Sequence, residues 1–222
     1  LSANAPLLQR WFAASGHPAA ADPYFLYGAS NLGGIMALLG YPVLIEPLLR
    51  LQAQAWLWTL GYALLTALIA ILALMLWRRG RGGQDSPPHP AAASAAGAAV
   101  TWRLRLHWLI LAFAPSSLLL GVTAHITTDV AAVPLLWVLP LALYLLTFVI
   151  AFARRPALRH HWLVKAQPFV VLPVTLLFWW DVRIPALFII LHLAAFFVTA
   201  MVCHGELIRR RPASRDLTQF YL

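Results

Sequence analysis

Six long and almost uninterrupted apolar stretches are the feature that most constrains this chain. They cover approximately residues 24–49, 54–77, 106–124, 130–153, 162–180 and 184–207. A helix needs about 20 apolar residues to cross the hydrocarbon core of a bilayer, which is roughly 30 Å thick. Lipid offers no hydrogen-bond partner to backbone N–H and C=O groups, which favours helices because they satisfy these groups internally. The strands of a membrane β-barrel would alternate polar and apolar residues, and these stretches do not. The stretches therefore predict an all-α, polytopic transmembrane helix bundle with about six spans.

The composition excludes several other classes of protein. The 222 residues are 62% hydrophobic and only 10% charged, whereas about a quarter of the residues in a soluble domain are charged. Too few polar side chains are present to cover a water-soluble surface or to keep a chain disordered. A single cysteine excludes a disulfide framework and a multi-cysteine metal site.

The positive charge is distributed unevenly between the two sides that six alternating spans create. One side receives 14 of the 16 Lys and Arg residues. These are Arg10, Arg78, Arg79, Arg81, Arg103, Arg105, Arg154, Arg155, Arg159, Lys165, Arg209, Arg210, Arg211 and Arg215. Arg50 and Arg183 lie on the other side. The positive-inside rule makes the basic side cytoplasmic, so both ends of this multi-pass chain are expected to face the cytoplasm. The net charge of +9 then indicates orientation in a lipid bilayer rather than a nucleic-acid partner.

The sequence divides into five segments. They are a cytoplasmic or interfacial lead-in (1–23), two transmembrane helices (24–77), a basic linker rich in Pro, Gly and Ala (78–105), four transmembrane helices (106–207) and a basic cytoplasmic segment (208–222). Asp216 is a candidate cap for a further helix. The chain begins with Leu1 and stops within an apolar run. We therefore expect it to be part of a longer membrane protein, whose remaining helices would be its partners.

A polar string, His125-Ile-Thr-Thr-Asp129, separates two of the spans at the predicted outer face. In one interpretation it forms a polar vestibule where His125, Thr128 and Asp129 bind a substrate, a cation or a proton, because histidine titrates near neutral pH. In the other, Thr127 or Thr128 caps the following helix and Asp129 lies in its first turn.

Two further polar positions occur near the C-terminal end. His204 and Glu206 could contact a ligand or an attached domain; alternatively Glu206 pairs with Arg209 or Arg210 and His204 is an interfacial histidine. His192 lies inside the last span, where an ionisable group is a functional candidate by default. It either lines a substrate cavity or is a hydrogen-bonded core residue.

A stretch rich in small residues lies in the first span. Ser30, Gly33, Gly34 and Ala37 share a face that allows close helix approach, with Asn31 forming a hydrogen bond across the interface. The alternative is that Asn31 contacts a substrate. No catalytic set, no metal site and no cofactor motif is found, since phosphate-binding, nucleophile-elbow and zinc-protease motifs are all missing from the sequence.

Long strings in the chain resemble the membrane region of bacterial fused spermidine synthase-like proteins. They are DPYFLYGASNLGG and YPVLIEP in the first span, PSSLLLGVTAHITTDVAAVPLLWVLPLALYLLTFVIAF, and CHGELIRRRPASRDLTQFYL. The resemblance implies a transporter-like, major facilitator-like membrane region that precedes a cytoplasmic domain similar to aminopropyltransferases and methyltransferases. No catalytic residue of such a domain matches a position here.

Three functions remain open. The leading hypothesis is a non-catalytic membrane region that anchors the cytoplasmic domain and supplies its substrate, for which a polyamine is one candidate. The second is a secondary transporter of a small, largely apolar or weakly cationic solute. The third is a membrane enzyme that acts on a lipid or a quinone. Carboxylates are rare within the spans, and this disfavours a path for highly charged polyamines.

Overall fold

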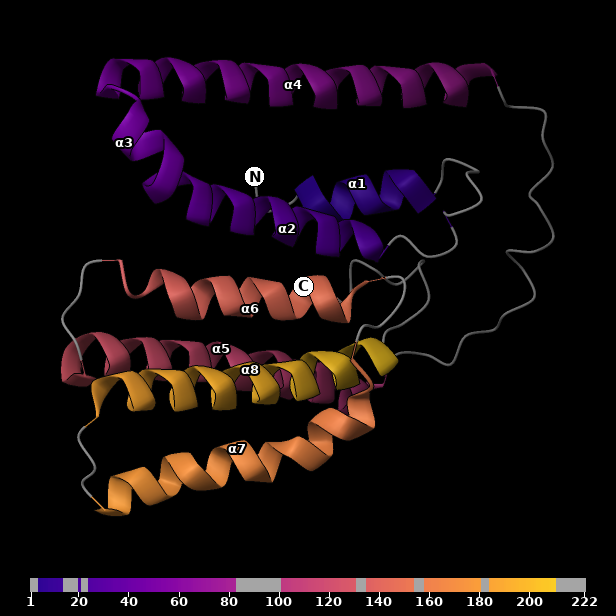
Figure 1. Ribbon diagram of the computed structural model, residues 1–222. Coiled ribbons are helices and arrows are strands. Elements are labelled where there is room, and N and C mark those ends of the chain that lie inside the picture. The colour runs from indigo at the N-terminus through magenta and orange to yellow at the C-terminus, as the bar shows by residue number, and fades with distance from the viewer. Residues whose placement is uncertain are drawn as a thin grey trace. The chain divides into compact units, whose positions relative to one another are not determined.

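The computed structural model describes residues 4–13, 20, 24–82, 101–130, 135–153, 158–180 and 184–210, and the regular structure within these ranges is helical throughout. The α-helices in Figure 1 are α1 (Asn4–Ala13), α2 (Phe25–Gly40), α3 (Glu46–Leu48), α4 (Leu51–Gly82), α5 (Trp102–His125), α6 (Val138–Ala151), α7 (His160–Trp180) and α8 (Pro185–Arg209). Two π-helical segments, η2 (Tyr41–Ile45) and η4 (Ile126–Val130), join them. The predicted all-α fold is confirmed.

Each predicted span corresponds to a helix, but not all of these helices have the dimensions of a membrane span. Within the residues that the structure describes, four stretches are long and apolar enough to cross a bilayer: Phe25–Leu48, Leu51–Met75, Trp102–Val130 and Pro185–Arg209. The apolar helix α6 has only 14 residues, and α7 has 21 residues that include two prolines. These helices are those of a membrane protein.

The boundaries differ from the prediction around the fourth span. We expected it to begin near residue 130, whereas η4 extends α5 to Val130 and α6 begins at Val138. The backbone at Leu135 has a φ of 65°, a value that a right-handed helix excludes. The chain therefore changes direction before α6 instead of entering it directly.

The predicted linker (78–105) is helical at both of its ends. Helix α4 continues to Gly82, and α5 begins at Trp102. Thr101 caps α5, because its side-chain oxygen accepts a hydrogen bond from the Leu104 amide at 3.4 Å. Helix α1 likewise occupies part of the lead-in (1–23). The rest of the linker and the candidate cap Asp216 lie outside the described residues.

The chain forms two compact units, residues 1–39 with 100–222 and residues 40–99. We call them the main bundle and the hairpin unit. In the main bundle, α8 packs against α5, α6 and α7 (Figure 1), and α5 also contacts α6. Helix α8 is therefore the element around which the main bundle is built.

The core of the main bundle lies where α5 meets α8. Val122 and Ile126 pack with Phe196 and Ala200, and all four are buried. The ring of Tyr144, on α6, stacks on Phe196 with a centroid separation of 6.4 Å. Lipid is as apolar as these side chains, so close van der Waals packing rather than burial from water holds such helices together.

The helix ends that carry basic residues meet at one end of the main bundle. The Trp108 indole Nε1 donates a hydrogen bond to the Arg210 carbonyl at 3.0 Å, which joins the start of α5 to the end of α8. His160 Nε2 lies 3.5 Å from Glu206 Oε2, which brings the start of α7 to the same place. The predicted alternation of helix direction is confirmed for α5, α7 and α8.

In the hairpin unit, polar contacts close the turn between η2 and α4. The Tyr41 hydroxyl donates to Gln54 Oε1 at 3.0 Å, and Gln54 Nε2 donates to the Leu49 carbonyl at 2.9 Å. Pro42 lies within η2 and Pro47 within α3, and the backbone becomes extended at Leu49. Proline lacks an amide hydrogen and disrupts regular α-helix, which accounts for the irregular helical segment here.

Substitution of Gly28 by leucine should weaken the packing of α2 on α6. A Cβ at Gly28 would lie 3.7 Å from Phe152 Cβ, so the rest of a leucine side chain has no room. We expect Gly28→Leu to reduce the free energy of unfolding by about 1–3 kcal/mol, measured by thermal denaturation of the purified protein in detergent.

The matched control is Gly33→Leu on the same helix. No atom lies within 4 Å of a Cβ at Gly33, so this variant should gain roughly 0.7 kcal/mol of helix propensity without a clash. Equal melting temperatures for the two variants would contradict the packing of α2 on α6.

Candidate functional site

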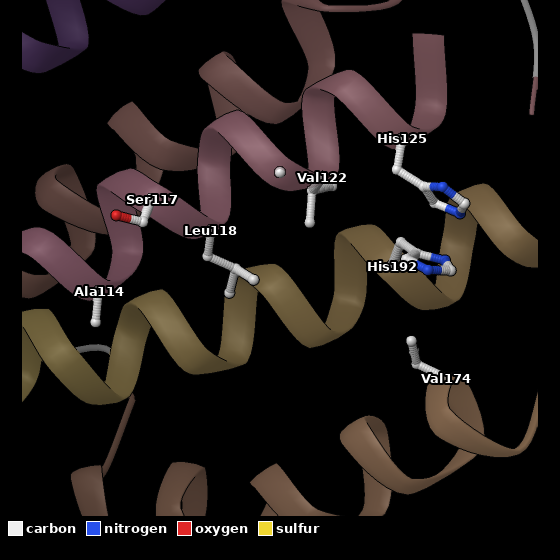
Figure 2. Close-up of a pocket in the computed structure, with 8 residues that line it drawn as sticks. Ala114, Ser117, Leu118, Val122, His125, Val174 and His192 are labelled. Carbon is white, nitrogen blue, oxygen red and sulfur yellow. The ribbon is translucent and has the colours of Figure 1, made fainter. Parts of the chain in front are cut away.

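A groove in the main bundle runs between α5, α7 and α8, and Figure 2 shows the side chains along it. Its volume of about 530 Å³ falls within the range of small-molecule sites, about 300–1,000 Å³. Its lining residues are Ala114, Ser117, Leu118, Gly121, Val122, His125, Val174 and His192. The groove is apolar along most of its length.

The groove follows one face of α5, because its residues there recur at helical spacing. The face runs from Ala114 through Ser117 and Gly121 to His125, a length of roughly 16 Å at a rise of 1.5 Å per residue. Small side chains leave space beside the helix: no atom lies within 4 Å of a Cβ built at Gly121. This face was not predicted from the sequence, although its small residues recur there at spacings of three and four.

Two imidazole rings form the polar end of the groove. Figure 2 shows His125 on α5 facing His192 on α8, and their ring centroids are 4.9 Å apart. His192 is 7% exposed, and its Nδ1 lies 2.7 Å from the Phe188 carbonyl oxygen. A carbonyl oxygen can only accept, so Nδ1 carries the hydrogen, and in the neutral ring Nε2 is the basic nitrogen. His192 is therefore a hydrogen-bonded core residue that also lines the groove, and its contact with a substrate stays a prediction.

His125 is oriented by Asp129. Its Nδ1 lies 2.8 Å from Asp129 Oδ2, and an ionised carboxylate only accepts hydrogen bonds. The hydrogen of a neutral His125 therefore resides on Nδ1, and its Nε2 is basic, as in His192. The Asp129 side chain is 64% exposed and does not line the groove. Its effect on the groove is to orient the ring of His125.

The alternative capping role of the two threonines is wrong. Thr127 and Thr128 lie in η4, where their hydroxyls donate to the carbonyls of Thr123 and Ala124 at 2.8 and 2.6 Å. Their hydroxyls give hydrogen bonds to carbonyl groups at the end of α5 and do not cap the start of the next helix. Thr128 Oγ1 also lies 3.2 Å from Asp129 Oδ1, but the single hydroxyl hydrogen goes to the closer Ala124 carbonyl.

Asn31 lies on α2, away from the residues that line the groove. Its Nδ2 donates to the Tyr27 carbonyl of its own helix at 2.8 Å, and the predicted hydrogen bond across a helix interface is wrong. A carbonyl one turn earlier is always within reach of such a side chain, whereas a partner on another helix requires a particular packing. Helix α2 approaches α6 at Gly28 and at Gly34, where a Cβ would lie 3.7 Å from Phe152 Cβ and 3.5 Å from Leu145 Cδ1, but no atom lies within 4 Å of a Cβ at Gly33.

His204, on α8, is fully buried against α6. Thr147 Oγ1 lies 2.6 Å from the Tyr144 carbonyl and 2.9 Å from His204 Nδ1. The single hydroxyl hydrogen goes to the carbonyl, so His204 Nδ1 donates to Thr147. The imidazole also stacks on Phe148, with a centroid separation of 3.9 Å. These contacts give His204 a structural role in the main bundle.

Glu206 forms the predicted ion pair with Arg210. Arg210 Nε lies 2.6 Å from Glu206 Oε1, and His160 Nε2 approaches the other carboxylate oxygen. Because His204 and Glu206 contact different partners, they do not converge on one ligand. Within the described part of the chain, no group of three or more His, Cys, Asp or Glu side chains could hold a metal ion.

No protein-family model, curated protein or solved structure matches this chain. The groove and its two histidines are therefore the basis for functional inference, together with the helix arrangement.

Removal of the Thr147 hydroxyl should destabilise the main bundle. Thr147→Val keeps the shape of the side chain but leaves the buried His204 N–H without an acceptor, which costs about 1–3 kcal/mol. Thermal denaturation in detergent measures the loss, and Thr147→Ser should restore most of it. The control is Thr175→Val, because Thr175 is exposed and donates only to the Val171 carbonyl of its own helix; an equal effect at both positions would contradict the role of Thr147.

Proposed function

We propose that this chain is the non-catalytic membrane region of a bacterial spermidine synthase-like fusion protein. It anchors a cytoplasmic domain similar to aminopropyltransferases or methyltransferases and holds a small solute for that domain. The long strings from DPYFLYGASNLGG to CHGELIRRRPASRDLTQFYL support the family, and four helices of membrane-span length support the anchoring role.

The observation that carries this proposal is the collection of basic residues at one end of the main bundle. Arg103 and Arg105 follow the start of α5, Arg159 precedes α7, and Arg209 and Arg210 end α8. The contacts Trp108–Arg210 and His160–Glu206 bring these helix ends together. Positive residues favour the cytoplasmic side of the inner membrane, which is where a soluble domain attached to this end would lie.

The positions of the tryptophans support a bilayer around the chain. Trp56 and Trp77 lie towards opposite ends of α4, and Trp162 and Trp179 lie near opposite ends of α7. All four side chains are exposed. Exposed tryptophan near both ends of an apolar helix is typical of the two membrane–water interfaces.

A reporter fused after Arg81 tests the orientation. We expect a fluorescent protein to be active there and alkaline phosphatase to be inactive, because Arg78, Arg79 and Arg81 hold this end in the cytoplasm. A fusion after Arg50 should show the opposite pattern. Active phosphatase after Arg81 would overturn the proposed topology, and recovery of the chain in a soluble fraction would overturn the anchoring role.

A second candidate function is transport of a small, largely apolar or weakly cationic solute. The groove at His125 and His192 favours it, because an apolar wall with a polar end suits such a solute. A free polyamine fits less well, since no carboxylate is among the lining residues. His204 and Glu206, the two groups that a lipid or quinone enzyme would use, are engaged in separate contacts.

Uptake of radiolabelled phenethylamine into proteoliposomes tests transport. We expect uptake above that of protein-free liposomes, and a decrease of about tenfold for His192→Ala, equivalent to about 1.4 kcal/mol. Asn31→Ala is the control and should leave uptake unchanged, because Asn31 bonds to its own helix. Uptake that is equal in both variants would contradict transport through this groove.

A further inference from the structure

We propose that the basic end of the main bundle binds an anionic phospholipid, with the head group on its cations and the acyl chains along the adjoining apolar faces of α5 and α7. The inference rests on the proposed function only in that the chain lies in a bilayer. It goes beyond that function because it names the class of lipid that the chain selects from the bilayer.

The charge at this end of the main bundle is almost entirely positive. Its described Lys and Arg residues, all of them exposed, are Arg103, Arg105, Arg159, Lys165, Arg209 and Arg210. Among the described residues at this end of α5, α7 and α8, Glu206 is the single carboxylate, and it lies against Arg210 and His160. The surface therefore keeps a net positive charge, which attracts a negatively charged partner.

Two contacts place these cations on one surface instead of on three separate helix ends. The Trp108 indole donates to the Arg210 carbonyl, which ties the start of α5 to the end of α8. A Cβ built on Gly205 would lie only 2.8 Å from His160 Nδ1, so the start of α7 approaches the end of α8 as closely as a glycine allows (Figure 1). The end of α8 thus contacts the starts of both other helices.

Two exposed tryptophans hold cations at the depth of the lipid head groups. The Arg103 Cζ atom lies 5.8 Å from the centroid of the Trp102 ring, and Lys165 Nζ lies 5.7 Å from that of Trp162. At these distances the ring face attracts the cation. Tryptophan lies at head-group level in a bilayer, so both cations lie where the phosphates of phospholipids are found.

The apolar side chains next to these cations favour a phospholipid over other anionic partners. Large exposed apolar residues continue along the same two helices: Leu106, Leu109 and Phe113 on α5, and Val164 and Phe169 on α7. An acidic protein face or a free phosphate matches the cations alone, whereas a phospholipid joins a phosphate to hydrocarbon chains and matches both. Basic pockets between membrane helices on the cytoplasmic side bind anionic lipid head groups.

Retention of lipid by the purified full chain in a non-ionic detergent, measured by native mass spectrometry, tests this inference. The probes are phosphatidylglycerol and phosphatidylcholine with identical acyl chains, so that only the net charge of the head differs. We expect roughly tenfold more retained phosphatidylglycerol, since each Lys or Arg near an anionic lipid adds about 1 kcal/mol. An excess of inorganic phosphate should not displace it, because phosphate has no acyl chain.

Substitution of single cations tests the position of the site. Lys165→Gln and Arg103→Gln should each lower the retention of phosphatidylglycerol about fivefold, which corresponds to about 1 kcal/mol for one cation. Both side chains are exposed, so the fold is retained. The matched control is Arg50→Gln, which removes the same charge from an exposed position before α4 in the hairpin unit. It should leave the retention unchanged.

Trp162→Leu tests the role of the indole. Leucine keeps an apolar side chain beside Lys165 but cannot attract its ammonium group, so we expect about two- to fivefold less retained phosphatidylglycerol, the equivalent of about 0.5–1 kcal/mol. Trp179→Leu is the control, because Trp179 is also exposed but lies at the opposite end of α7. This control should behave like the wild-type chain.

Four outcomes would overturn the inference. Equal retention of the two lipids would indicate an unselective lipid shell, and displacement by inorganic phosphate would indicate a site for a soluble anion. Displacement by polyglutamate would indicate an acidic protein surface as the occupant. A preference for phosphatidylglycerol that survives both Lys165→Gln and Arg103→Gln would place the site elsewhere in the chain. None of these outcomes changes the expected activities of the reporter fusions, so the two proposals fail separately.

Discussion

The constraint that the rest of this structure depends on is the demand for hydrogen bonds in an apolar environment. Polar side chains on its helices repeatedly donate to a carbonyl one turn earlier. The pairs are Asn31 with Tyr27, Thr59 with Ala55, Thr66 with Tyr62, Ser116 with Ala112, Thr127 with Thr123, Thr128 with Ala124, Thr175 with Val171 and His192 with Phe188. Lipid supplies no competing partner, so each of these side chains bonds to the nearest backbone carbonyl. A polar residue in a span is therefore weak evidence for a ligand until its own helix has been considered.

Histidine differs from these residues because it has a second nitrogen. A hydrogen bond from Nδ1 to the backbone or to a neighbouring side chain orients the ring. The surroundings of Nε2 then determine the role of the residue. His192 and His204 lie on the same helix, roughly 18 Å apart along its axis at 1.5 Å per residue. One borders the groove opposite His125, and the other is enclosed by Thr147, Tyr144 and Phe148. Identical side chains on α8 thus acquire different roles from the helices that face them.

The sequence predicted the elements far better than it predicted their partners. Apolar length located the helices of the six predicted spans, because it is a local property, and the Glu206–Arg210 pair followed from helical spacing. Helix α1 lies in the lead-in, where no helix was predicted. The break at Leu135 escaped prediction, since the apolar run continues through it. The contact of His204 with Thr147 was not predicted, because it depends on which helix faces α8. Asn31 bonds to its own helix although one interpretation expected a bond across an interface. The groove escaped for the same reason: Ala114, Ser117 and Gly121 form a cavity only beside α7 and α8.

The position of the groove limits what it can do. It extends for roughly half of a hydrocarbon core that is about 30 Å thick, and its polar end lies opposite the basic end of the main bundle. The start of α7 is held against the end of α8 by the approach of His160 to Glu206 and to Gly205. Passage of a solute to the basic end would require α7 to move away from α8 there. Pro168 and Pro173 interrupt α7 between that contact and Val174, and proline is the usual cause of a helix bend. A fixed α7 makes the groove a binding site, and only a bend at these prolines would make it a path.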